Sequence, residues 1–507
     1  MALWQGYPKS RQSRIHPSHA SFRVPRRKFL KAAGLNFVLL QLLFLGLFCY
    51  LFGSIWQQDI HTHNMNVLFV DYDGGVVGTA IRDAYKTLQA DTFPTLEERT
   101  SDQFPTVEML REEVCKTHFW AALYISQGAS ARLASALPGG SAAATYNRSD
   151  VMAFIWNEAR YSAVVDSAIE QSLQTLASEA HVAYVANNGT GALRTLNATS
   201  SAAISVFATP WQLVSLNIQP TTQGARLIYN TLVIILILIQ EFFYLGTING
   251  LFVQFKIYAK LYPHRIIAYR NMISLAYTFV GSLCVTGAIW AFRDGWNVNG
   301  NQFALTWAVL WLFAHQNFLW LDVFTIWSPP QYIPMCLITW IVFNVSSILV
   351  PFELSSRFYR WSYAMPAHEV YQVLTDIWSR GCNPQLYYAL PILFTLEIVA
   401  LFLGAMGVYR RCHYAVLAEE AQEAQFRERL EVAMASERKR DEERKQRGEA
   451  SNNIQEEKTE GEELAEVIRK EDSKLLKMQT KESRACNFGP SFDLAFKENT
   501  SSESVSD

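Results

Sequence analysis

Three ionisable side chains lie inside long apolar runs of this sequence: Glu241, His315 and Glu397. An ionisable group is costly to place in a membrane helix, so each one is a candidate functional group. A cavity lined by them could bind a cationic or polar substrate, or carry a proton. The alternative is that they form interhelical hydrogen bonds that hold a helix bundle together. Four neutral polar residues accompany them in either role: Gln240, Gln316, Asn317 and Asn344.

Motifs of other chemistries are absent from the sequence. It contains no G-x-x-x-x-G-K-[ST] phosphate loop, no His-Glu-x-x-His and no Cys-x-x-Cys. We therefore predict no ATP hydrolysis by the chain itself, no catalytic residue, no metal, no cofactor and no enzyme activity. Asp71 and Asp73 follow a predicted strand, where helix capping is favoured over metal binding. Asp322 and Glu353 lie near the predicted membrane edges, where an ionisable side chain needs less explanation than it does inside the membrane.

Six apolar runs could position these side chains. A bilayer core of about 30 Å is crossed by about 20 helical residues. The composition agrees, with 50% hydrophobic and 18% charged residues, the latter below the usual quarter. We predict a polytopic α-helical membrane protein with six transmembrane helices at Ala33–Trp56, Ile228–Phe252, Met272–Trp290, Phe303–Phe324, Ile333–Val350 and Tyr387–Tyr409.

Basic flanks predict the orientation of the chain. Lysines and arginines cluster before the first run, follow the second and end the last at Arg410 and Arg411. Positive segments stay in the cytosol, so this clustering indicates topology rather than a nucleic-acid partner. The first run is too long for a cleaved signal peptide, and we expect an uncleaved anchor. The predicted segments are a cytosolic basic arm (1–32), a first transmembrane helix (33–56), an extracellular α/β domain (57–225), a five-helix membrane domain (226–411) and a cytosolic charged tail (412–507).

Strands alternate with helices in the predicted extracellular domain, which indicates an α/β or α+β fold. The expected strands are Asn66–Val70, Phe119–Ile125 and Ala142–Tyr146. The expected helices are Val76–Leu88, Val107–Cys115, Ser130–Leu137 and a long run at Val151–Val185.

Two more helices are predicted outside the bilayer. The apolar residues of Val370–Trp378 predict an amphipathic helix that lies at the membrane surface. In the tail, opposite charges repeat at helical spacing over Leu417–Arg447. They predict a solvated helix, with a short coiled coil as the alternative, although no apolar heptad lasts three repeats. Beyond Gly448 we expect disorder.

Sequons and cysteines bear on the compartment of the domain. Asn147, Asn188 and Asn197 each begin an N-x-[ST] sequon inside the segment that charge bias places outside the cell. We predict glycosylation at all three. Cys115 and Cys382 are the two cysteines on the predicted outer side. They could pair and tie the domain to the membrane block, but the sequence does not supply the required Cα separation.

Four short sequence segments resemble those of a known family: Asn66–Gly75, Asn249–Leu261, Arg270–Ala291 and Met365–Leu374. Through them the chain resembles the fungal family that contains the nitrosoguanidine-resistance protein, over roughly residues 35–411. Its plan of one helix, an external domain and five helices is similar to that of type-2 ABC exporter membrane subunits. The resemblance implies a membrane protein of the plasma membrane linked to resistance against toxic small molecules. It implies no site residues.

Two functional hypotheses follow from these patterns. The first is an exporter-like membrane protein that contributes to resistance to toxic small molecules. It would be driven by a separate ATPase or by a proton gradient, with Glu241 and Glu397 as proton carriers and His315 assisting. The second is a non-transporting scaffold that affects lipid organisation or signalling through the external domain and the tail. The partners considered are membrane lipids, a second copy of the chain, and a separate ATPase or signalling protein.

Overall fold

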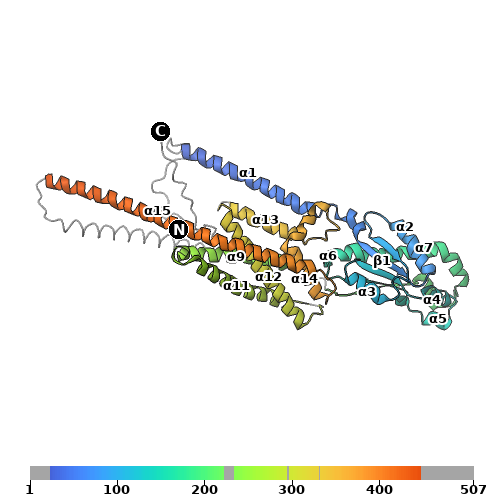
Figure 1. Ribbon diagram of the computed structural model, residues 1–507. Coiled ribbons are helices and arrows are strands. Elements are labelled where there is room, and N and C mark those ends of the chain that lie inside the picture. Colours follow the sequence, from blue (N-terminus) through green and yellow to red (C-terminus); the bar gives the residue numbers. More distant parts are fainter. Residues whose placement is uncertain (1–22, 222–232, 294–295, 330–331, 447–507) are drawn as a thin grey trace, which may run out of the picture. The chain divides into compact units, whose positions relative to one another are not determined.

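The computed structural model describes residues 23–221, 233–293, 296–329 and 332–446 (Figure 1). Contacts divide the chain into two compact units, one up to Trp56 and one from Gln57 onward. The first unit contains the helix α1, Arg23–Ser54, most of whose side chains are exposed in this unit. Most of the predicted basic arm and the tail beyond residue 446 lie outside the described residues.

Residues 57–221 form a unit that we call the sheet domain. A five-stranded mixed sheet lies at its centre, in the order β2-β1-β3-β4-β5. Neighbouring strands are parallel except for β3 and β4, which are antiparallel. The strands are β1 Asn66–Asp71, β2 Thr95–Arg99, β3 Ala121–Ile125, β4 Met152–Trp156 and β5 Leu213–Asn217. The α/β class predicted for this segment is therefore present as a fold.

Helices cover both faces of the sheet, and the alternation of β1 shows why. Val67 and Phe69 face the core shared with α2 and α7, whereas Leu68 and Val70 face the smaller core beneath α3. Successive strand residues point to opposite faces, so a strand with both faces covered is apolar throughout. The helices are α2 Val76–Leu88, α3 Val107–Cys115, α4 Ala129–Ala136, α5 Gly140–Ala144, α6 Ser162–Val165, α7 Gln171–Thr195 and α8 Ser201–Ala208.

Two predictions for this segment are wrong. Residues 140–144 form α5 instead of a strand, because their alanines are strong helix formers and only Ala143 is buried. The predicted helix Val151–Val185 begins with the strand β4, and helix starts only at Ser162. All five residues of β4 are buried, and periodicity alone cannot distinguish a short buried apolar strand from a buried helix.

Five helices of the described chain are long and apolar enough to cross a membrane. They are the spans Arg26–Ser54 of α1, Val233–Gln254 (α9), Pro263–Ala291 (α11), Gly300–Trp327 (α12) and Leu386–Ala435 of α15. The short helix α10, Ile257–Lys260, links α9 to α11. The most buried of the five, α12, contacts α9, α11 and α15. Its first turn has a capping box between Asn299 and Gln302.

The predicted fifth span is shorter than expected. Helix α13 covers Ile333–Ser346, 14 residues, or about 21 Å at 1.5 Å per residue. The hydroxyls of Ser346 and Ser347 bond to carbonyls of the last turn, and Pro351 follows a few residues later. The chain leaves the helix before Val350, so six full-length spans are not found among the described residues.

The segment after α13 enters the protein interior instead of lying on a surface. It forms the 3-10 helix η9, Arg357–Ala364, and α14, Pro366–Trp378. Helix α14 packs against α12 and α15. Its apolar residues are buried, and so are His368 and Glu369. The prediction of an amphipathic surface helix is wrong, because neighbouring helices and the sheet domain cover both of its sides.

Helix α15 is longer than any predicted element. It runs without a break from Leu386 to Gln446, 61 residues, and Figure 1 shows it continuing past the ends of α9, α11 and α12. The last predicted span and most of the predicted tail helix are therefore one helix. Its distal part carries an exposed ion pair with the α9–α10 turn, Lys256 to Glu419, at 3.0 Å.

Candidate functional site

Two of the three predicted ionisable residues meet inside the helix bundle. His315 on α12 and Glu397 on α15 are 4% and 9% exposed, and the Nδ1 and Oε1 atoms lie 2.5 Å apart. On the other side of the ring, Nε2 lies 3.2 Å from the hydroxyl of Ser274 on α11. The second carboxylate oxygen of Glu397 is buried and has no hydrogen-bond partner among the described residues. Helices α11, α12 and α15 thus each supply one side chain to a continuous hydrogen-bonded row.

The hydroxyl of Ser274 has a second partner, the carbonyl of Asn271 at 3.0 Å. A hydroxyl has one proton to donate but can also accept, whereas a neutral imidazole has one donor and one acceptor nitrogen. With neutral His315, Ser274 can donate to Nε2. With doubly protonated His315, Nε2–H can donate to Ser274, whose own proton then faces Asn271. The site satisfies both protonation states by rotation of one hydroxyl.

Glu241, the third predicted residue, stands apart from this pair. It lies on α9, is 0% exposed, and neither carboxylate oxygen has a hydrogen-bond partner in the described part of the chain. Gln316 on α12 is equally buried, and both of its amide atoms are also unpartnered there. No hydrogen bond between described residues joins Glu241 to His315 or Glu397. The structure therefore gives a bonded pair and a separate buried carboxyl.

The other polar residues of the runs hold elements together. The amide oxygen of Asn317 accepts from the indole of Trp340 at 3.0 Å, which joins α12 to α13. Asn344 accepts from the backbone N–H of Ala367 at 3.1 Å, which joins α13 to the start of α14. Gln240 packs on Gly281, where an added Cβ would lie 2.4 Å from its amide nitrogen. For Asn317 and Asn344 the packing role is the one found.

A buried ionic cluster was missed by sequence reasoning. Asp322 on α12 pairs with Arg270 of α11 at 2.6 Å and with Arg411 of α15 at 2.9 Å. The hydroxyl of Tyr258, on α10, accepts from both arginines at 3.1 Å. Asn249, on α9, accepts from Arg270 at 2.7 Å. In the sequence, Asp322 lies near a predicted membrane edge and the arginines lie in basic flanks. These positions indicate the topology of the chain but not a contact between the three side chains.

This cluster joins five helices through three fully buried charges, Arg270, Asp322 and Arg411, each 3% exposed or less. Removing one partner of a buried ion pair leaves an uncompensated charge, which is strongly destabilising. Two guanidinium groups share one carboxylate here, and the neutral acceptors Tyr258, Asn249 and Thr325 take further N–H bonds from them. We infer that the cluster fixes the ends of these helices relative to one another.

The acidic pair after β1 serves the fold of the sheet domain. Asp73 accepts from the backbone N–H of Ser130 at 3.1 Å, in the first turn of α4, although neither aspartate is the N-cap residue of α2 or α4. Asp71 pairs with Arg82 of α2 at 2.8 Å. The described residues contain no group of histidine, cysteine and acidic side chains that could hold a metal ion.

The disulfide and the predicted glycosylation residues bear on the side of the membrane on which the sheet domain lies. Cys115, the last residue of α3, forms a disulfide with Cys382, which follows α14. The pairing left open by the sequence is therefore present. Of the predicted glycosylation residues, Asn147 and Asn197 are exposed and Asn188 is half-buried on α7. The Asn197 side chain accepts from the hydroxyl of Thr199, within its own sequon, at 2.7 Å.

Comparison with known proteins identifies a family and one partial relative. The model of the family described as "Protein of unknown function (DUF3533)" matches residues 36–402. YJR015W of Saccharomyces cerevisiae, an uncharacterized endoplasmic reticulum membrane protein, is 28% identical over 138 residues, 24% of this chain and 26% of that protein. The chain thus spans about a quarter of that relative. No solved structure matches. The apolar helices and this relative agree on a membrane location.

Proposed function

Since this chain belongs to the DUF3533 family of proteins of unknown function, we propose its activity from its site: it is an exporter-like membrane protein that contributes to resistance to toxic small molecules, of the nitrosoguanidine-resistance type. The observation that carries the proposal is the buried pair of His315 and Glu397 with Ser274 beside it. Buried ionisable groups facing a bundle interior typically mark ion or substrate pathways.

The pair is suited to carry a proton. When His315 takes up a proton at Nε2, the new N–H donates a hydrogen bond to the Ser274 hydroxyl oxygen. The resulting imidazolium stays paired with Glu397 across 2.5 Å. Loss of the proton returns the serine hydroxyl to donating. Neither state leaves a ring nitrogen without a partner, so the two states differ little in hydrogen bonding. This is the property required of a group that binds and releases a proton within a transport cycle.

Glu241 is proposed as the second proton carrier. An ionised carboxylate without a partner is very costly in an apolar interior, and neither oxygen of Glu241 has one among the described residues. We infer that this carboxyl holds a proton in the conformation described. Because it is not bonded to His315 or Glu397, proton passage between them needs a change in helix packing, as expected of a transporter that alternates between conformations.

The location and energy source are proposals of the same kind. We propose a plasma-membrane protein with six spans, cytosolic termini and an extracellular sheet domain. The Cys115–Cys382 disulfide supports the outer placement, because disulfides persist in oxidising compartments. Membrane lipids are proposed to cover exposed apolar side chains such as Met272, 64% exposed. A second copy of the chain and a partner ATPase remain proposed partners.

Accumulation of a labelled nitrosoguanidine in intact cells tests this function. Cells lacking the protein are compared with cells carrying the wild type, Glu397→Gln, Glu241→Gln or the control Glu423→Gln, at matched surface levels. Glu423 is an exposed acid on α15, the same helix as Glu397. We expect high accumulation in the deletion and in the two buried-acid variants, and low accumulation in the control. Equal accumulation in every line would refute export.

The scaffold remains the second candidate, and α15 favours it. Beyond Arg411 this helix continues to Gln446, and many of its described side chains in that stretch are exposed. A rigid charged helix of this kind could recruit signalling proteins. Under the scaffold hypothesis, deletion of residues 417–507 removes resistance while Glu397→Gln preserves it. The exporter hypothesis predicts the opposite ranking of these two variants.

A further inference from the structure

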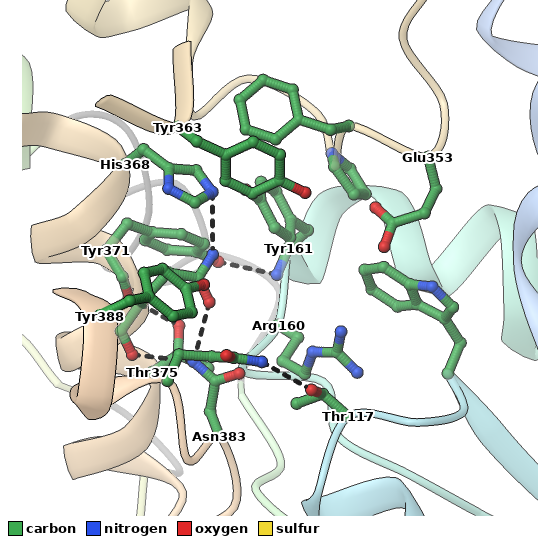
Figure 2. A pocket seen from close by; sticks show the side chains of 15 residues that line it. Thr117, Arg160, Tyr161, Glu353, Tyr363, His368, Tyr371, Thr375, Asn383 and Tyr388 are labelled. Atoms are coloured by element: carbon green, nitrogen blue, oxygen red, sulfur yellow. Dashed lines mark hydrogen bonds between the residues drawn. The ribbon is translucent and has the colours of Figure 1, made fainter. Parts of the chain in front are cut away.

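A cavity of about 190 Å³ lies where the sheet domain meets the segment after α13, helix α14 and the start of α15 (Figure 2). Contacts between these parts define its walls. The hydroxyl of Tyr371 accepts from the backbone N–H of Tyr161 at 2.7 Å and lies 3.1 Å from the carbonyl of Ala159. The Cys115–Cys382 disulfide closes the same junction. The cavity is smaller than most drug-binding pockets, so it suits a small ligand.

Arg160 supplies an unpaired cation to this cavity. Its guanidinium lies 4.0 Å above the ring of Trp120, and its Nη1 is buried without a hydrogen-bond partner in the described chain. No described acidic side chain forms an ion pair with it. Burial lowers the pKa of Arg160, because desolvation penalises the charged form, and the charge of Glu353 in the same cavity offsets part of this lowering. Even so, a guanidinium stays protonated in proteins, and a buried charge needs a counter-charge. An anionic group fits this position.

Glu353 supplies the opposite charge to the same space. Its carboxylate has no hydrogen bond or ion pair with another described residue, and Figure 2 shows it directed into the cavity, as is the hydroxyl of Tyr363. The rings of Tyr161 and Tyr388 also line the cavity. Carboxylates and aromatic faces both attract cations, and ammonium groups are commonly recognised by such a combination. A cationic group fits this end.

The amide side chains of the lining are already bonded within the protein. Gln385 donates to Thr117 at 2.8 Å, and Asn383 donates to the carbonyl of Gln372 at 2.9 Å. The first bond fastens the sheet domain to the start of α15, the second fixes the loop after α14, and together they leave few amide groups for a ligand. Arg160 and Glu353 are thus the charged side chains of this lining that form no ion pair with a described residue.

We propose that this cavity binds a small zwitterion, with its anionic group on Arg160 and its ammonium group between Glu353 and the tyrosine rings. The chemistry is that of a phosphate joined to an alkylammonium, either as a free molecule or as the headgroup of a lipid. The site is separate from the His315–Glu397 pair, and the proposal does not depend on export. Bound there, the zwitterion would bridge the sheet domain and the helices.

Binding of phosphocholine to the purified full-length protein in detergent tests the soluble form, and binding of phosphatidylcholine vesicles tests the lipid form. Inorganic phosphate and choline serve as single-charge probes. The variants are Arg160→Gln and Glu353→Gln, with Arg99→Gln as the control, since Arg99 pairs with Glu97 on the edge strand β2. Labelling of free thiols checks that the Cys115–Cys382 disulfide persists in each variant.

We expect the wild type and the Arg99 variant to bind phosphocholine or the vesicles, and both cavity variants to bind at least about tenfold more weakly, as for loss of a charge-assisted bond. Binding of phosphocholine indicates a free ligand, and binding of the vesicles alone indicates a lipid headgroup. If Arg160→Gln does not fold, thermal unfolding of the wild-type protein replaces that variant as the test. Phosphocholine or the lipid must then raise the thermal midpoint of the wild type. Phosphate binding as tightly as phosphocholine, undiminished binding in both cavity variants, or no binding of either form would overturn the proposal.

Discussion

His315 and Glu397 are 82 residues apart in the chain, yet the Nδ1 and Oε1 atoms lie 2.5 Å apart inside the helix bundle. The contact joins α12 to α15, and Ser274 extends it to α11. A proton bound at the imidazole therefore acts on three helices that a transporter would have to move.

Ser274 should act as a positioning residue for His315. Ser274→Ala removes the hydroxyl that serves both protonation states, so we expect export to fall by about tenfold, the weight of one bond to a charged group. The pH dependence of export by this variant should also shift. The measurement is the export rate between pH 5 and 8.

Ser282→Ala is the matched control for that variant. Ser282 is buried on the same helix, and its hydroxyl donates to the carbonyl of Phe279 at 3.0 Å, with no second partner for the hydroxyl among the described residues. Its loss should leave the pH profile unchanged. An unshifted profile in Ser274→Ala as well would remove the serine from the account.

Asp322 should be the most sensitive residue of the buried ionic cluster. Asp322→Asn leaves Arg270 and Arg411 without a counter-charge, and we expect a stability loss of about 3–5 kcal/mol. Thermal unfolding of the purified protein measures the effect. Glu419→Gln breaks the exposed Lys256 pair and should cost about 0–1 kcal/mol. Equal midpoints for the two variants would show that the cluster contributes little.

The disulfide should stabilise the attachment of the sheet domain to the helices. It joins residues 267 positions apart, and removing a native disulfide typically costs about 2–5 kcal/mol. Cys115→Ser, Cys382→Ser and the double variant should lose the same amount, because each breaks the same bond. Cys49→Ser, at an exposed free cysteine of α1, should have no effect. Additive losses in the double variant would contradict a shared bond.

Glycosylation tests the side of the membrane on which the sheet domain lies. Asn147→Gln, Asn188→Gln and Asn197→Gln should each increase gel mobility by one glycan, and a glycosidase should abolish the differences. Asn187→Gln is the control, since Asn187 is exposed beside Asn188 and begins no sequon. If the glycosidase leaves the wild type unchanged, glycosylation of the domain is contradicted and only the Cys115–Cys382 disulfide still supports the outer placement.

The elements that the sequence predicted well are those with one strong local signal. Helix α2 has the predicted bounds of Val76–Leu88, because its apolar residues repeat at helical spacing and glycines precede it. Strand β4 was mistaken for helix because a short apolar run that is buried on both faces carries no periodicity. The edge strand β2 was missed because Thr95–Arg99 is largely polar. The other edge strand, β5, was also missed.

The site was predictable in its residue types but not in its contacts. Buried polarity singled out Glu241, His315 and Glu397, whereas helix rotation decides that the last two meet and Glu241 does not. The Arg270–Asp322–Arg411 cluster could have been suspected from an acid and two arginines near the ends of apolar runs. The Arg160 cavity had no sequence signal, because its walls come from the sheet domain, α14 and α15.

Proton-coupled export in reconstituted vesicles tests the central claim most directly. Purified wild type and Glu397→Gln are placed in vesicles with an imposed pH gradient, and transport of the labelled nitrosoguanidine is followed with and without a protonophore. We predict gradient-dependent transport by the wild type that the protonophore abolishes, and none by the variant. Transport by Glu397→Gln at the wild-type rate, or transport that ignores the gradient, would contradict the role of the His315–Glu397 pair.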